Sequence, residues 1–71
     1  MKISYDKEVD AAYISLSDEK PEAAIEVADG VYVDLTHDKH VVGIEILDAS
    51  KKLPLKTLFT LEFDSELIEA A

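Results

Sequence analysis

The sequence has 71 residues and no cysteine, and its 16 acidic and seven basic side chains give a formal net charge of −9. We expect one domain, residues 1–71, with a core so small that self-association is an economical way to cover apolar surface. Disulfides and thiolate zinc sites are excluded, and the negative charge disfavours binding to nucleic acid or to anionic membranes.

Two stretches with period-two alternation open the chain. Residues 1–5 and 11–17 alternate apolar with polar side chains, the pattern of a strand with one buried face. The polar residues 6–10 between them predict a hairpin connection, so these strands should pair antiparallel. Residues 18–21 contain nothing to bury and end in a proline, which predicts a loop.

A second pair of strands is predicted around Asp29-Gly30, a strong signal for a tight turn. Residues 22–28 alternate before it, although their alanines and glutamates are also good helix formers. The proline before this stretch and the turn after it favour a strand. Residues 31–36 alternate after the turn, and residues 37–40 predict the next turn.

The longest apolar run, residues 40–50, is the best candidate for a central strand. Both sides of its pleat carry apolar side chains, with Val42, Ile44 and Ile46 on one and Val41, Gly43, Glu45 and Leu47 on the other. This is typical of a strand covered on both faces. Gly43 within the run predicts either a β-bulge or a position where another part of the molecule closely approaches the strand backbone.

Helical signals appear only after this run. Asp48 or Ser50 could cap a brief helix by accepting from free backbone amides. Pro54 suits the first turn of a further helical segment, in which three apolar residues meet at helical spacing: Leu55, Leu58 and Phe59.

Residues 57–63 fit a strand as well as a helix, and residues 64–71 could form one capped helical turn. Our prediction is a turn or two of helix followed by a short final strand. The fold class is then α+β and mainly β. We expect a single antiparallel meander of about five short strands, with a short helical segment near the C-terminus packed on one face.

Three segments resemble a known family. Tyr5-Asp6, Asp10–Leu16 and Val41–Lys51 are similar to the YuzE-like family, also called domain of unknown function 2283. The resemblance implies a small bacterial or archaeal cytoplasmic domain without an established activity. Members are sometimes encoded beside a small toxin-like protein, which implies an antitoxin-like or inhibitor role. Lys39 stands where the family commonly has a glycine, so Lys39 or His40 should take a strained backbone conformation.

The turn at residues 37–40 is the candidate for metal chemistry. His37 and His40, with Asp34 and Asp38 nearby, are of the types that bind zinc or nickel. Neighbouring side chains in a hairpin turn point apart, so the interpretation as solvated turn residues is favoured. We predict no metal or other cofactor. A metal- or ligand-binding protein or enzyme that uses this turn is the alternative function.

Other catalytic patterns are weak. The sequence has no Gly-x-Ser-x-Gly turn and no glycine-rich phosphate loop. Glu45 is the carboxylate to consider, because it lies in the apolar strand on the face shared with Val41 and Leu47. Its simpler interpretation is a side chain whose stem packs while its charged end reaches water or pairs with a lysine, because an unpaired buried carboxylate is costly. We therefore predict no enzymatic activity.

Tyrosines, small residues and one carboxylate are expected to share a sheet face. We predict an interaction surface formed by Tyr13, Tyr32, Val41, Glu45 and Leu47; an ordinary solvated sheet face is the alternative. Because no leader pattern and no membrane-length apolar run is visible, we expect a cytoplasmic protein. The predicted function is a non-enzymatic protein-interaction module, with a basic, toxin-like partner or a second copy of the chain as its ligand.

Overall fold

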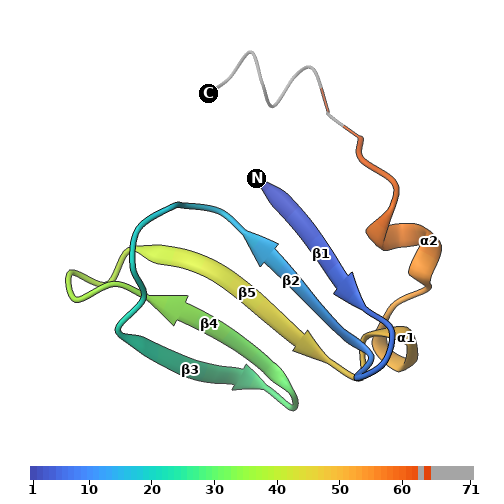
Figure 1. Ribbon diagram of the computed structural model, residues 1–71, viewed down its shortest axis with the longest axis horizontal. Helices are drawn as coiled ribbons and strands as arrows, with labels where there is room; N and C mark the ends of the chain where they lie inside the picture. The colour runs from blue at the N-terminus through green and yellow to red at the C-terminus, as the bar shows by residue number, and fades with distance from the viewer. Residues whose placement is uncertain (63, 65–71) are drawn as a thin grey trace.

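Each of the five alternating stretches forms a strand, and the apolar residues after them form two short helices (Figure 1). The computed structural model describes residues 1–62 and 64. Its elements are β1 (Lys2–Asp6), β2 (Ala11–Ser15), β3 (Ala23–Ala28), β4 (Val31–Leu35), β5 (Val41–Leu47), α1 (Ala49–Lys52) and α2 (Leu55–Leu58). The predicted class, a mainly β fold built on one antiparallel sheet with helix near its end, is confirmed.

The strand order departs from the predicted meander. The order is β1-β2-β5-β4-β3, with every pair antiparallel, so β5 lies between two hairpins and β3 forms an edge (Figure 1). The reason is the apolar content of β5, which requires neighbours on both sides, whereas all six residues of β3 are exposed. The prediction that residues 40–50 contain the central strand is confirmed.

The connection from β2 to β3 carries the chain across the end of the sheet. It begins with the N–H groups of Leu16 and Ser17, which donate to the Val42 carbonyl at 2.8 and 3.1 Å. It ends with the N–H of Glu22, which donates to the Leu35 carbonyl at 2.8 Å. Backbone hydrogen bonds therefore hold both ends of the crossing against the sheet.

A β-bulge interrupts β5 beside this crossing. Asp34 pairs with Gly43, whereas the next residue, Leu35, pairs with Val41, so Val42 is the extra residue. Val42 is only 4% exposed. The β-bulge predicted from Gly43 is therefore present, at the residue before it. The bulge interrupts the alternation of side chains along β5, on which the predicted position of Val41 depended.

The helices cover one end of a sheet face. Ala12 of β2, Ala49 of α1 and Leu58 of α2 form the buried cluster, and three partly buried apolar side chains pack against it: Tyr5, Ile46 and Leu53. This is the predicted packing of a helical segment on one face. Only four apolar residues in the described chain are buried, the fourth being Val42.

Two details of the C-terminal prediction are wrong. Thr57 and Leu58 belong to α2, and residues 59–62 form no strand, because a helical turn after Pro54 is what brings Leu58 into the buried cluster. Asp48 stands at the N-cap of α1 but makes no side-chain cap hydrogen bond. The predicted helical turn at residues 64–71 lies outside the described residues, apart from Asp64.

Among the residues that the structure describes, three other than glycine adopt positive φ, and all lie in turns: Asp10 (53°), Lys39 (65°) and Asp48 (52°). Gly30 has a φ of 69° in the predicted Asp29-Gly30 turn. The expectation that Lys39 or His40 takes a strained conformation is confirmed at Lys39. A lysine in this region clashes with its own carbonyl, which costs about 1–2 kcal/mol.

Lys39→Gly should therefore raise the free energy of unfolding by about 0.5–1 kcal/mol, after the greater flexibility of unfolded glycine is subtracted. Urea denaturation followed by circular dichroism measures the change. Lys39→Ala is the control, because it removes the side chain without relieving the backbone and should give no gain. An unchanged or lower midpoint for Lys39→Gly would contradict the argument.

Candidate functional site

The sheet face opposite the helices carries tyrosines and carboxylates in one row across all five strands. Directly opposed residues of antiparallel strands share a face, and the row runs Ser4, Tyr13, Glu45, Tyr32, Glu26. Asp34 lies in the next row on the same face, paired with Gly43. We call the surface formed by Tyr13, Glu26, Tyr32, Asp34 and Glu45 the acid–tyrosine face.

Tyr13 lies across Gly43. Its hydroxyl donates to the Asp34 carboxylate at 2.9 Å, which takes the side chain from β2 over β5 to β4. A Cβ on Gly43 would approach the Tyr13 oxygen to 2.1 Å and the carbon bearing it to 2.4 Å. The close approach predicted at Gly43 is thus made by the Tyr13 ring, and only glycine leaves room for it.

The environment of the two tyrosines keeps both hydroxyls protonated. Burial of the ring and the hydrogen bond to Asp34 raise the pKa of Tyr13. The negative charge of Glu26, with a hydrogen bond to it, raises the pKa of Tyr32. Glu45 pairs with both tyrosines in the row and adds to both shifts. The Tyr13 hydroxyl is therefore a hydrogen-bond donor that holds the Asp34 carboxylate in place.

Glu45 stands at the centre of this row with an exposed side chain. Within the described chain it has no ion-pair partner, so its charge is available to solvent. Glu26 is also exposed, while its carboxylate accepts the N–H of Gly30 at 3.1 Å. These two carboxylates flank Tyr32 on a surface open to a partner.

The other two residues predicted for the interaction surface lie away from this row. Leu47 pairs with Ala11 at the far end of β5 and is 37% exposed. The prediction for Val41 is wrong: Val41 pairs with Leu35, which shares a face with Val33, so the bulge places Val41 on the face opposite Glu45, where it is 45% exposed. The sequence reasoning brought Tyr13, Tyr32 and Glu45 together correctly, but it missed Glu26 and Asp34, because their position depends on strand order.

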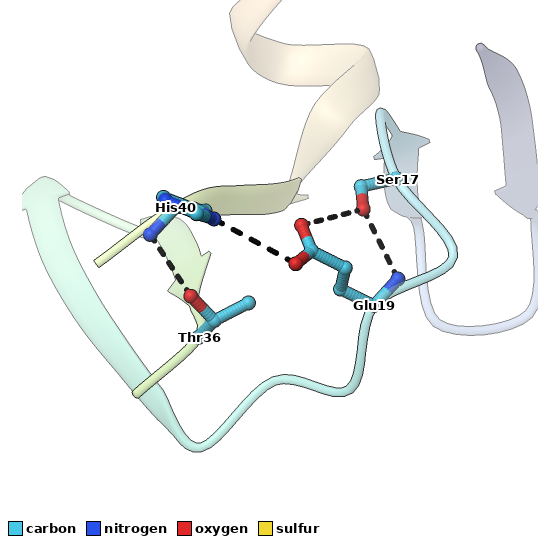
Figure 2. Close-up of polar contacts among 4 residues, drawn as sticks. All are labelled: Ser17, Glu19, Thr36 and His40. Atoms are coloured by element: carbon cyan, nitrogen blue, oxygen red, sulfur yellow. Dashed lines mark hydrogen bonds and ion pairs between the residues drawn. The ribbon is translucent and has the colours of Figure 1, made fainter. Parts of the chain in front are cut away.

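The two histidines lie at the opposite end of the sheet from the helices, where the crossing connection meets the β4–β5 turn. Figure 2 shows His40 directed at Glu19, with 3.6 Å between Nδ1 and Oε1. The His40 N–H donates to Thr36 Oγ1 at 3.0 Å, and the Glu19 N–H donates to Ser17 Oγ at the same distance. The His40–Glu19 contact joins the crossing to the turn, and the two hydrogen bonds order the turn and the crossing separately.

His37 makes a separate pair, with 3.0 Å between its Nδ1 and Glu22 Oε2. Each histidine therefore faces its own glutamate. In residues 1–62 and 64 no group of three or more histidine, aspartate or glutamate side chains is placed to hold a metal ion. The geometry of the turn residues is that of solvated loop contacts, with His37 84% exposed at its side chain.

A family model described as "Protein of unknown function (DUF2283)" matches residues 2–50. The chain belongs to the DUF2283 family. The match spans all five strands and the start of α1, so every residue of the acid–tyrosine face lies inside the DUF2283 region. No curated protein and no solved structure matches the chain.

Asp10 is a polar centre of the DUF2283 region that sequence reasoning missed. Its Oδ1 accepts from the Tyr5 hydroxyl at 2.7 Å and from the Ser50 N–H at 3.0 Å, and its Oδ2 accepts from the Ser50 hydroxyl at 2.7 Å. The Asp10 carbonyl also accepts the Ala49 N–H at 2.9 Å. Asp10 thus supplies the cap of α1 that Asp48 does not.

This DUF2283 chain has only short helices in its described part, and neither α1 nor α2 has the length or apolar character needed to cross a bilayer.

The titratable groups whose pKa values are clearly shifted all lie on or beside the sheet. The Ser50 and Tyr5 hydrogen bonds lower the pKa of Asp10, and the Asp10 hydrogen bond raises the pKa of Tyr5. Asp10 is therefore a structural anion in a fixed position.

Proposed function

We propose that this chain is a non-enzymatic protein-interaction module whose acid–tyrosine face binds a basic protein. The observation that carries the proposal is the single row in which Glu26, Tyr32, Glu45 and Tyr13 stand side by side on neighbouring strands. The row contains no basic side chain. It therefore presents negative charge and aromatic rings without an internal cation to neutralise them.

The chemistry of this face suits lysine and arginine side chains. Exposed carboxylates form charge-assisted hydrogen bonds with guanidinium and ammonium groups. A tyrosine ring beside them attracts the same cations, by about 0.5–1 kcal/mol at exposed positions. The hydrogen bond of Tyr13 to Asp34 holds its ring in place before binding, which lowers the ordering cost of association.

The overall charge supports the same class of partner. A formal net charge of −9 speeds encounters with a positively charged protein and slows encounters with nucleic acid. One form of this proposal is an antitoxin-like role, in which the acid–tyrosine face covers a basic surface of a small toxin. A reading frame for a small basic protein beside this gene would supply the partner to test.

Affinity capture with matched variants tests the proposal. Glu26→Gln/Glu45→Gln removes two charges from the face, and Glu8→Gln/Glu62→Gln removes two exposed charges elsewhere. At low salt, wild type and control should retain the same basic protein, and the face variant should bind it at least about 10-fold more weakly. Binding should also weaken as salt screens the charges. Equal binding by both variants, or no protein retained by wild type, would overturn the proposal.

A further inference from the structure

The face of the sheet opposite the acid–tyrosine face is apolar and only partly covered: Ile14, Val33 and Ile44 are half-buried. Its central row crosses all five strands as Ile3, Ile14, Ile44, Val33 and Ile25. None of the five belongs to the buried set, and the two at the sheet edges, Ile3 and Ile25, are 36% and 49% exposed. We call this row and the apolar residues beside it the apolar face.

The helices protect only one end of the apolar face. The neighbouring row contains Tyr5, Ala12 and Ile46, which contact Ala49 and Leu58 in the buried cluster. The central row lies beyond this contact. A stable sheet needs a second layer across its apolar face, and the two four-residue helices, α1 and α2, provide only part of one.

We infer that a second copy of this chain covers the apolar face, so that two sheets stack into a symmetric dimer. Five strands about 4.8 Å apart and five residues long give a flat area of roughly 400 Å² per copy. This figure includes the end already covered by the helices. A small specific interface buries about 500 Å² per partner, so the dimer needs nearly all of the apolar face that the helices leave open. A two-fold axis needs one self-complementary patch, and the uncharged row meets this condition.

The distribution of charge selects this face for self-association. Glu26, Asp34 and Glu45 all lie on the acid–tyrosine face, so stacking through that face would bring six carboxylates together. Stacking through the apolar face directs them outward, roughly 20 Å apart across two sheets whose backbones are about 10 Å apart. That separation exceeds the Debye length of about 8 Å at physiological salt, so the repulsion between copies is screened.

Two substitutions on the edge strand β3 test which face of the sheet forms the dimer interface. Ile25→Glu places a charge in the central row of the apolar face, and Ala24→Glu places the same charge on the opposite side of β3. Because each dimer contains two copies of the substitution, Ile25→Glu should raise the dimer dissociation constant at least about 100-fold. Ala24→Glu should change it by less than about threefold. Sedimentation equilibrium of the full chain measures both constants.

A second measurement covers the case in which Ile25→Glu fails to fold. For a dimer, the urea midpoint of the wild type rises with protein concentration, whereas a monomer has a fixed midpoint. A monomeric wild type with a fixed midpoint would overturn the inference and indicate that residues of the same chain cover the face. A dimer dissociated by Ala24→Glu and not by Ile25→Glu would also overturn it. This inference stands independently of the basic partner, because its test needs no other protein.

Discussion

Gly43→Ala is expected to lower the free energy of unfolding by about 2 kcal/mol, a large share of the stability of so small a domain. The added Cβ would lie 2.1 Å from the Tyr13 hydroxyl oxygen and 2.9 Å from the Ile14 carbonyl oxygen. The carbonyl belongs to the β2 backbone and has little freedom to move. The Tyr13 ring must therefore leave β5, and its hydrogen bond to Asp34 is lost.

A double-mutant cycle identifies the cause of this loss. If the ring is the main obstacle, Gly43→Ala should cost about 1 kcal/mol less in a Tyr13→Ala background than in the wild type. Urea denaturation of the four proteins gives the coupling energy. Equal costs in the two backgrounds would show that the ring does not determine the requirement for glycine.

Asp10→Asn is expected to lower the melting temperature by about 5 °C at pH 7, the size of effect usual for losing a helix cap in a small domain. Asparagine keeps the shape of the side chain and tolerates the positive φ of 53° at this position. The substitution therefore removes the charge that accepts hydrogen bonds from Tyr5 and Ser50 without straining the backbone.

The pH dependence of this effect has a defined sign. The pKa of Asp10 is lowered in the folded chain, first by its Ser50 hydrogen bond. Its stabilisation is thus fully present above the unfolded value of about 3.9 and is lost as the pH falls through the folded value. The gap in melting temperature between wild type and Asp10→Asn should be constant from pH 5 to 8 and close below pH 4.

Asp18→Asn is the matched control, because it removes one exposed carboxylate and should leave the melting temperature within about 1 °C of wild type. Differential scanning calorimetry across the pH series measures all three proteins. A gap that persists unchanged at pH 2.5 would show that the Asp10 charge is not the source of the stabilisation.

Local pattern was sufficient to predict all five strands of this fold and the tight turn at Asp29-Gly30. Each signal lies within a few residues of sequence, as in the alternation of β5. Strand order was not predictable in the same way, because it depends on which edges meet after the hairpins form. The meander prediction was wrong because neither the strand patterns nor the turns record that β5 pairs with β2.

The candidate site was also only partly predictable from local sequence pattern. Tyr13, Tyr32 and Glu45 were placed on one face by alternation alone. Their partners Glu26 and Asp34 required the register between strands, and the tie between Asp10 and Ser50 joins residues 40 positions apart. The signal available for Asp10 was its place at the end of a polar turn, which indicated a turn residue and did not indicate a helix cap.

The strand order also determines where chain entropy is lost during folding. The β1–β2, β3–β4 and β4–β5 hairpins each close a short loop, whereas the β2–β5 pairing joins Ser15 to Gly43 across a much longer segment. Loop closure costs more for longer segments, and non-local pairing slows folding. The Tyr13–Asp34 and Asp10–Ser50 hydrogen bonds both cross this seam. They therefore stabilise the contact that the chain has the greatest difficulty forming.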